Sequence, residues 1–382
     1  MTRVGKTDVL ITGLAVLSAF GRGPGALAAG LDAGRPAFAP VTRFDVSGRR
    51  VGVAATLPGS PDLDDELWWL VDEACDEAKL GTADRAGSPL FLAVHGDPRL
   101  ARASAADRPR HGGSAFAADL AEHTGLSRLH TPRAYTSACV AASTAIADAA
   151  GAIARGEAGR IVVAGGYLVE PDQFALFDAG RALAADGQVR PFSAHRRGLL
   201  LGDGAGAVVL ESTAAAAERG VEPLARLAGW GRAGDAHHPC QPHPEGRGLA
   251  RAVADALRRG GIGPADVGYV NAHGSGTAQS DAAETLALRT AFGEHAATVP
   301  VSSTKALHGQ ALEASGILEL AVALHALRGG RLPVNAGYLE PDPACALDLV
   351  LGERRPAFPQ YVLSLNAAFG GSNTALLLGA VS

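Results

Sequence analysis

Short apolar runs alternate along this chain with longer segments rich in alanine and leucine. The runs at 160–166 (RIVVAGG), 206–212 (GAVVLES) and 268–274 (GYVNAHG) each fit a buried strand. A longer run at 361–380 (YVLSLNAAFGGSNTALLLGA) also predicts strand structure, and the run at 8–20 (DVLITGLAVLSAF) predicts a buried strand followed by a turn. Strands spaced in this way, with helices between them, are typical of an α/β fold.

Three segments predict helices, and two others predict loops. The helical segments cover 139–156, 246–261 and 315–330, and each ends at glycine, a residue that commonly terminates a helix. The segments 97–114 and 232–247 are polar and contain several glycines and prolines, so we expect them to form surface loops.

Length and composition indicate two structural units. The chain has 382 residues, of which 47% are hydrophobic, and it exceeds the size at which a single core usually stops growing. Similar strands open and close the chain, and each half contains helix-rich sequence. We therefore expect an N-terminal half at 1–215 and a C-terminal half at 216–382.

Charge and cysteine content exclude several classes of protein. A formal net charge of −5 without a dense Lys/Arg cluster argues against a nucleic-acid partner, and no apolar run is long enough for a membrane span. The N-terminus superficially resembles a signal peptide, but Asp8 and the β-branched residues after it favour a strand. The four cysteines, Cys75, Cys139, Cys240 and Cys345, lie far apart, so we expect neither a disulfide framework nor a metal site. Without a disulfide framework, we expect a cytoplasmic location.

Cys139 lies in YTSACVAAS, at the predicted start of an alanine-rich helix. The simpler interpretation is a small buried hydrophobic residue. The alternative is a reactive thiol, because the dipole at a helix N-terminus favours the thiolate.

Three further stretches carry more polar residues and glycines than a core element needs. The first is 271–284, where His273 follows a predicted strand and glycines allow a substrate to approach the backbone. The second, 301–316, contains Lys305, whose simpler interpretation is a solvated surface amine. The third, 365–378, places Phe369 before two glycines, although a plain turn between strands also fits. A cysteine and histidines in separate segments form a thiolate nucleophile where the fold brings them together.

Several long motifs, in the same order, resemble those of the β-ketoacyl synthase family, in its ketosynthase II and polyketide ketosynthase branch. The matching stretches are VLITGLAVLSAFG, SACVAAS, RPFSAHRRGLLLGDGAGAVVLE, DAHHPCQPHPEG, NAHGSGT, LPVNAGYLEPDP and AAFGGSN. The resemblance runs nearly end to end. It implies a thiolase-like α/β fold, with two similar α/β halves in a five-layer αβαβα arrangement.

The resemblance also implies a role for each matching residue. Cys139 would take an acyl group from an acyl carrier protein or coenzyme A, whose phosphopantetheine arm carries the substrate, and no tightly bound cofactor is expected. His273 would be the first catalytic histidine, and the backbone N–H groups of Cys139 and Phe369 would form the oxyanion hole. The predicted catalytic residues are Cys139, His273, Lys305, Gln310, Glu319 and the gating Phe369. The predicted substrate-binding residues are Ser275, Thr277, His308, Gly370 and Gly371.

Gln310 is the most informative departure from the family pattern. The family's second histidine lies in STKxxxGHxxGAAG, and this chain reads STKALHGQALEASG. The amide of Gln310 donates a hydrogen bond but has no transferable proton and does not become a cation. His308 lies two positions earlier. In an extended loop its side chain would face the same way at a displacement of roughly 6 to 7 Å, which is too large a misplacement for us to expect that it compensates for Gln310.

Other departures surround the same motifs. His195 and Arg197 stand where the family usually has acidic residues, Ala367 replaces a phenylalanine near the gate, and Glu313 replaces a glycine. A relaxed requirement for substrate or partner is consistent with these changes.

Three functions fit this sequence. The first is a condensing enzyme of polyketide or fatty-acid biosynthesis, in which Cys139 is acylated and Gln310 is the second donor. The second is an acyltransferase that passes the acyl group to an amine, alcohol or thiol without decarboxylation. The third is a partner similar to a chain length factor, although such partners lack the nucleophile. We expect either a homodimer or a heterodimer with another ketosynthase-like chain.

Overall fold

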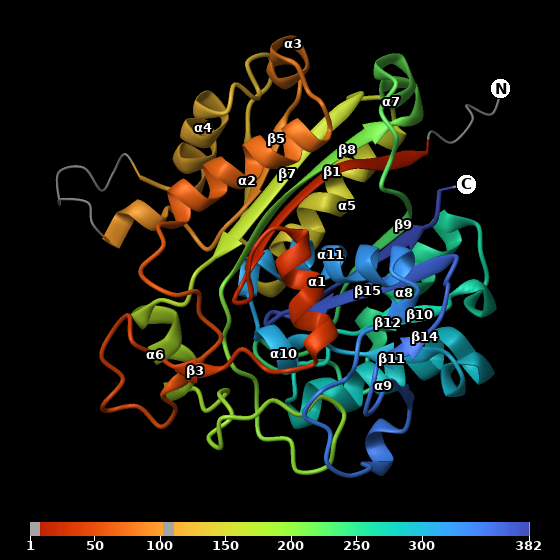
Figure 1. Cartoon of the computed structure of the whole chain (residues 1–382). Helices are drawn as coiled ribbons and strands as arrows, with labels where there is room; N and C mark the ends of the chain where they lie inside the picture. Colours follow the sequence, from red (N-terminus) through yellow and green to blue (C-terminus); the bar gives the residue numbers. More distant parts are fainter. Residues whose placement is uncertain (1–7, 102–110, 382) are drawn as a thin grey trace.

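The computed structural model describes residues 8–101 and 111–381, and its strands form a mixed sheet in two consecutive halves (Figure 1). In the first half, β5 (Leu90–Ala93) pairs in parallel with β6 (Arg133–Tyr135) and with β7 (Arg160–Tyr167). Antiparallel pairing then joins β7 to β8 (Gly204–Ser212), and β8 to β1 (Val9–Ser18). The order across this half is β6-β5-β7-β8-β1.

The second half repeats this order and these strand directions. Here β10 (Tyr269–Asn271) pairs in parallel with β11 (Pro300–Ser302) and with β15 (Tyr361–Ala367). Antiparallel pairing then joins β15 to β16 (Ser372–Gly379), and β16 to β9 (Ala225–Gly234). The order β11-β10-β15-β16-β9 matches that of the first half strand for strand. A short antiparallel pairing between β1 and β9 joins the two halves.

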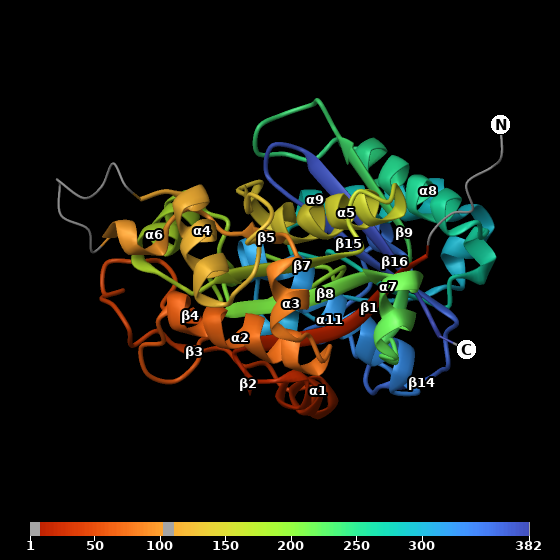
Figure 2. The same cartoon turned by 90° about the horizontal axis from the view of Figure 1, so that it is seen from above.

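Helices complete the five-layer αβαβα arrangement (Figures 1 and 2). The central layer contains α5 (Ala141–Ala154) and α11 (Ser315–Arg328), which contact strands of both halves and each other. The outer face of the first half is covered by α2 (Leu63–Glu77). The outer face of the second is covered by α8 (Arg247–Gly260), with α9 (Ala278–Phe292) packed against α8.

The sequence patterns of the helices explain their layers. In α8, Leu249, Val253 and Leu257 are spaced at helical period on the buried face, and arginines occupy the opposite face, as suits an outer helix. In α11, apolar residues occupy all faces of the helix and every residue except His325 and Arg328 is buried, as suits a central helix. Gly261, with φ +70°, ends α8 in the left-handed conformation that favours glycine.

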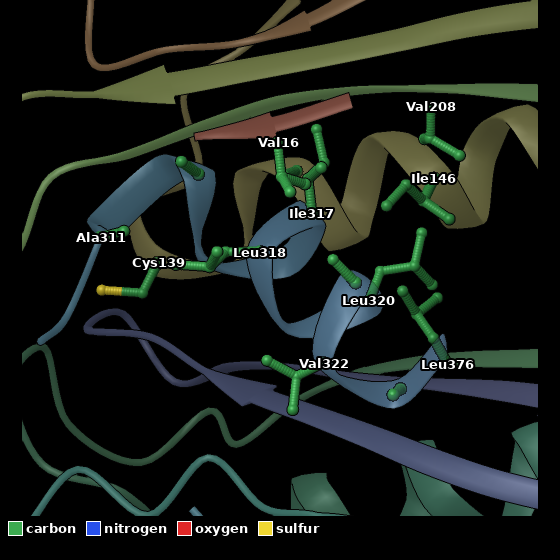
Figure 3. Packing of buried hydrophobic residues seen from close by; sticks show 14 of the residues in the cluster. Val16, Cys139, Ile146, Val208, Ala311, Ile317, Leu318, Leu320, Val322 and Leu376 are labelled. Atoms are coloured by element: carbon green, nitrogen blue, oxygen red, sulfur yellow. The ribbon is translucent and has the colours of Figure 1, made fainter. Parts of the chain in front are cut away.

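The two central helices approach each other closely. A Cβ atom on Gly316 of α11 would lie 2.3 Å from the backbone nitrogen of Ser143 of α5, so only glycine fits at this point. The side chains of Ile146, Ile317 and Leu320 pack around this contact, and Cys139 lies at its edge with its sulfur pointing away from them (Figure 3). The helix crossing therefore also fixes the backbone that bears Cys139.

The remaining helices and strands lie around these layers. They are β2 (Gly21–Arg22), α1 (Pro24–Ala33), β3 (Ala39–Pro40), β4 (Val53–Ala54), α3 (Thr82–Ala86), α4 (Gly113–His123), α6 (Pro171–Ala179), α7 (Thr213–Arg219), α10 (Lys305–His308), β12 (Arg331–Leu332), β13 (Asp348–Leu349) and β14 (Arg355–Pro356). In the described part of the chain, no helix combines the length and hydrophobicity that a bilayer span requires.

The predicted strands and helices are confirmed, with corrections at their ends. Cys139 lies in a 3₁₀ turn, Ala138–Val140, and α5 begins only at Ala141. The predicted loop 232–247 is wrong at its start, because β9 continues to Gly234. The predicted loop 97–114 includes residues 102–110, which lie outside the described residues. The boundary between residues 215 and 216 falls within α7 and stays a prediction.

Replacing Gly316 with alanine is expected to destabilise the fold by about 1–3 kcal/mol, because the added methyl group meets the backbone of Ser143. Urea denaturation followed by circular dichroism measures the change. Gly25→Ala is the matched control, since Gly25 lies in the first turn of α1 and its Cβ would meet no atom within 4 Å. Equal unfolding midpoints for wild type and Gly316→Ala would contradict the close packing of α5 and α11.

Candidate active site

A cavity of about 530 Å³ opens at the end of the central helices. Its wall comes from both halves of the sheet and contains six of the residues predicted from the sequence: Cys139, His273, Ser275, Thr277, Gln310 and Phe369. The fold thus brings together side chains that are up to 230 positions apart, from Cys139 to Phe369. A further cavity-lining thiol, Cys240, is exposed.

Cys139 is nearly buried, with 7% of its surface exposed. Ala138, just before it, has φ +51°, an uncommon value for a residue with a side chain, and this backbone places the thiol at the turn into α5. Burial, and then the charge of Glu313, raise the pKa of Cys139 to about 11. The position of Cys139 before α5 therefore does not by itself lower the pKa of the thiol, because burial and a carboxylate raise it.

His273 is held by its backbone on the loop after β10. Glu284 accepts hydrogen bonds from the N–H groups of His273 and Gly274, both at 2.7 Å, and burial raises the pKa of that carboxyl to about 8. The His273 carbonyl accepts a hydrogen bond from Lys305 Nζ at 2.7 Å. Burial, and then the charge of Lys305, lower the pKa of the His273 imidazole, so the ring is neutral.

Lys305 is buried, which excludes a solvated surface amine. Its ammonium group pairs with Glu319 of α11, and Glu319 also accepts a hydrogen bond from Asn366 of β15. Burial raises the pKa of Glu319, while Lys305 and Asn366 stabilise its charged form. This network lies behind His273 and connects α10, α11 and β15.

Gln310 is fixed by backbone hydrogen bonds. Its N–H donates to the Leu200 carbonyl at 2.8 Å, and its carbonyl accepts from the Gly202 N–H at 3.0 Å. Its side-chain amide hydrogen-bonds Cys139 and thereby lowers the pKa of the thiol, against the larger effect of burial. The amide oxygen of Gln310 has no partner among the described residues. Gln310 therefore places a neutral hydrogen-bonding group beside the sulfur.

The structure does not bring His308 to the cavity. Its Nδ1 donates to the Gly309 carbonyl at 2.9 Å, and its Nε2 accepts from the Thr304 hydroxyl at 2.8 Å. Burial, and then Lys305, lower the pKa of His308 to about 3. Both ring nitrogens are engaged away from the cavity, because α10 is helical rather than extended. The expectation that His308 binds substrate is therefore wrong, and His308 does not compensate for Gln310.

Two hydroxyls lie side by side in the cavity wall. The side-chain oxygens of Ser275 and Thr277 are 2.9 Å apart. Asp281 holds this loop by accepting hydrogen bonds from the N–H of Gly276 at 3.1 Å and of Phe192 at 2.8 Å. The loop therefore presents two adjacent polar groups on a fixed backbone.

Phe369 stands half-exposed at the cavity wall. Its ring centroid lies 5.9 Å from that of Phe177, and the turn after it is built by Gly370 and Gly371 with φ +85° and +73°. The Gly370 N–H donates to the Pro239 carbonyl at 2.7 Å. The two glycines shape the turn behind Phe369 but do not themselves line the cavity.

Three cavity-lining arginines were missed by sequence reasoning as site residues. Arg181, Arg196 and Arg197 line the cavity, although Arg196 is paired with Asp342. Arg196 and Arg197 lie in the matching stretch RPFSAHRRGLLLGDGAGAVVLE, but no role was assigned to them there, and Arg197 stood out only as a departure from the family pattern. Their convergence depends on the tertiary fold.

Comparison with known proteins gives consistent matches. Residues 115–216 match the family model for the beta-ketoacyl synthase N-terminal domain, and residues 224–338 match the model for the C-terminal domain. The chain is 31% identical to 3-oxoacyl-[acyl-carrier-protein] synthase 2 of Synechocystis over 98% of this chain and 99% of that protein. It is 33% identical to nodulation protein E of Rhizobium sp. strain N33, over 96% of this chain and 98% of that protein.

Solved structures show the same fold. The ishigamide ketosynthase/chain length factor superposes with a TM-score of 0.90 at 28% identity, covering 99% of this chain and 100% of that one. A beta-ketoacyl synthase from Burkholderia phymatum gives a TM-score of 0.88 at 27% identity, covering 98% and 100%. The fold is therefore the thiolase-like fold of ketosynthases, as the sequence resemblance implied.

The Cys139 thiol is expected to react slowly with iodoacetamide at neutral pH, with a rate that still rises above pH 9 because its pKa is about 11. Glu313→Gln removes the charge that most raises this pKa, so the rate at pH 8 should increase about tenfold for each unit by which the pKa falls. Mass spectrometry of the Cys139 peptide separates this reaction from that of exposed Cys240. Glu157→Gln, at an exposed carboxylate, is the control. A wild-type rate that levels off by pH 8 would contradict the raised pKa.

Proposed function

The chain belongs to the beta-ketoacyl synthase family, and from this premise we propose that Cys139 takes an acyl group from a pantetheine thioester and that the acyl group then condenses with a malonyl unit. As a member of this family the chain is an acyltransferase of the condensing-enzyme class. The observation that supports the proposal most directly is the shared cavity, in which Cys139, His273 and Gln310 lie next to two hydroxyls and a half-exposed phenylalanine.

In the first step, the Cys139 sulfur loses its proton and attacks the thioester carbonyl carbon. The new S–C bond forms, the bond from that carbon to the pantetheine sulfur breaks, and the departing pantetheine thiolate takes up the proton. Neutral His273 is the available base, because the cationic form is disfavoured by burial and Lys305. In this proposal the N–H groups of Cys139 and Phe369 bind the oxyanion.

The carrier of the acyl group is a phosphopantetheine arm, on an acyl carrier protein or on coenzyme A. The hydroxyls of Ser275 and Thr277 suit the amides of this arm, and Arg181 and Arg197 suit its phosphate. Phe369 opens and closes the way to Cys139, and its exposed ring and glycine turn support that role. Gly370 and Gly371 act on the substrate only through this movement.

In the second step, His273 and Gln310 bind the thioester carbonyl of the malonyl unit. That unit loses carbon dioxide, and its carbanion attacks the acyl carbonyl, with Cys139 as the leaving thiolate. Gln310 stabilises the enolate only as a neutral donor, so less of the developing charge is balanced than with a second histidine. Lys305 and Glu319 act by holding the His273 loop.

The second candidate function is acyl transfer from Cys139 to an amine, alcohol or thiol without decarboxylation. Gln310 favours it, because acylation of Cys139 needs no second histidine, whereas decarboxylation benefits from one. The third, a partner similar to a chain length factor, is less consistent with a cavity that contains Cys139.

We also infer that the protein is a dimer, either of two copies or with another ketosynthase-like chain. Among the described residues, β6 pairs on one side only, with β5, so its outer edge is available to a second chain. The ishigamide ketosynthase/chain length factor, which has the same fold, supports the second arrangement. A cytoplasmic location stays a prediction.

Incubation with hexanoyl-coenzyme A and malonyl carrier protein tests the proposal. Mass spectrometry should show a hexanoyl group on Cys139, and a ketoacyl product should form together with carbon dioxide. Cys139→Ala should abolish the acyl group on the enzyme and the ketoacyl product. Gln310→His should raise carbon dioxide release on the order of tenfold or more, because it restores a group that can carry positive charge.

Gln241→His is the matched control. Gln241 lines the same cavity, but unlike Gln310 it is not among the groups that change the pKa of Cys139. Acylation without carbon dioxide, followed by transfer to an added amine or alcohol, would favour the second function. A Cys139 that accepts no acyl group, alone or with a co-purified partner chain, would contradict both.

A further inference from the structure

Glu313 is a buried carboxylate beside the nucleophile, at a position where the related motif has glycine. It lies in the 3₁₀ turn Leu312–Ala314, only 2% exposed, directly after the segment that carries Gln310. This turn packs against the turn Ala138–Val140 that bears Cys139, and against β7. Glu313 itself does not line the cavity that opens beside Ser275 and Thr277.

One oxygen of Glu313 is paired and the other is not. Oε1 lies 3.1 Å from Nδ1 of His95, whose side chain is 65% exposed. The hydrogen bond to Glu313 raises the pKa of the His95 ring. Burial lowers this pKa, and the charge of Glu313 raises it further, so that the net change is a rise. Oε2 is buried and has no hydrogen-bond partner among the described residues. An unpaired buried carboxylate oxygen is costly, and such atoms call for a donor that the chain itself does not supply.

Glu313 acts on two nearby groups, the thiol of Cys139 and the phenol of Tyr167. Its charge raises the pKa of the Cys139 thiol, and the turn that carries Glu313 packs against the turn that carries Cys139. The buried Tyr167, at the end of β7, is the second neighbour: burial and then Glu313 raise the pKa of its hydroxyl, which is therefore neutral. Glu313 thus adds a carboxylate next to the turn of Cys139, whose neighbours in the core cluster otherwise include the apolar Ala311 and Leu318 (Figure 3).

We propose that Glu313 makes this enzyme selective for acyl groups that carry a hydrogen-bond donor close to the thioester, as in 3-hydroxyacyl and 3-aminoacyl groups. The donor on the substrate pairs with Oε2 and satisfies it, whereas a plain alkyl chain leaves that oxygen unpaired and desolvated. The exposed His95 holds Oε1, so that the carboxylate presents its other oxygen to the substrate. This inference rests on the proposed acylation of Cys139.

Acylation of Cys139 by three pantetheine thioesters tests this selectivity: butyryl, 3-hydroxybutyryl and 3-aminobutyryl. For the wild type, we expect 3-hydroxybutyryl to react about fivefold faster than butyryl, and 3-aminobutyryl about tenfold faster than butyryl. The amino compound should be the better substrate because a charged ammonium donor bonds a carboxylate more strongly than a neutral hydroxyl does. In Glu313→Gln, both ratios should fall towards one. Ratios within each variant remove the effect that Glu313→Gln has on the overall reactivity of the thiol.

His95→Ala supplies a second variant at an exposed side chain. It removes the group that holds Oε1, so Glu313 is no longer fixed with Oε2 towards the substrate and the preference for 3-aminobutyryl should fall. Glu157→Gln should leave every ratio unchanged. Equal rates for the three thioesters in the wild type, or ratios that Glu313→Gln does not change, would overturn the inference while leaving the proposed function intact. Failure of all three thioesters to modify Cys139 would contradict the proposed function itself.

Discussion

The site depends on a buried positive charge that must be neutralised where it lies. Lys305 is only 1% exposed, and an ammonium group without a partner would be too costly at such a position. Its partner Glu319 comes from a central helix. The ammonium group of Lys305 also donates a hydrogen bond to the carbonyl of His273. One ion pair therefore fixes the loop that carries the imidazole relative to α11, and so relative to the turn of Cys139. A second clamp, Glu284, acts on the same loop from the other side through its backbone N–H groups.

The electrostatics of the cavity follow from this arrangement. Burial and Lys305 keep His273 neutral, so the imidazole is a base rather than a cation. Burial and Glu313 raise the pKa of Cys139 to about 11, so little of the thiol is ionised at neutral pH. Gln310 adds a donor without adding charge. Two of the departures from the family pattern, Gln310 and Glu313, lie in one short segment, and together they make this site less cationic than that pattern.

Much of the fold was predictable from sequence, because it is encoded in local patterns. The apolar runs at 160–166 and 361–380 correspond to β7 and to the hairpin β15–β16, and the glycines at 261 and 329 mark the ends of α8 and α11. The resemblance to a family supplied the five layers, since no short pattern shows which helices become central.

The predictable part of the site is what motifs carry, namely Cys139, His273 and Gln310. What failed depended on tertiary packing. The direction of the His308 ring follows from the helical turn α10 and from Thr304, and the raised pKa of Cys139 follows from burial and from a carboxylate 174 positions away in sequence. Neither spacing nor composition reports such contacts. For the same reason the sequence did not show that Lys305 is buried, since a lysine at the start of a helix usually lies on the surface.

The most direct measurement of the central claim separates the stabilising role of the ion pair from its positioning role. Lys305→Met should cost about 3–5 kcal/mol of unfolding free energy, because it leaves Glu319 buried and unpaired, and Lys305→Met with Glu319→Leu should recover most of that stability. If the pair positions His273, the double variant folds but acylates Cys139 far more slowly than the wild type. A double variant that is both stable and fully active in acylation would contradict the account.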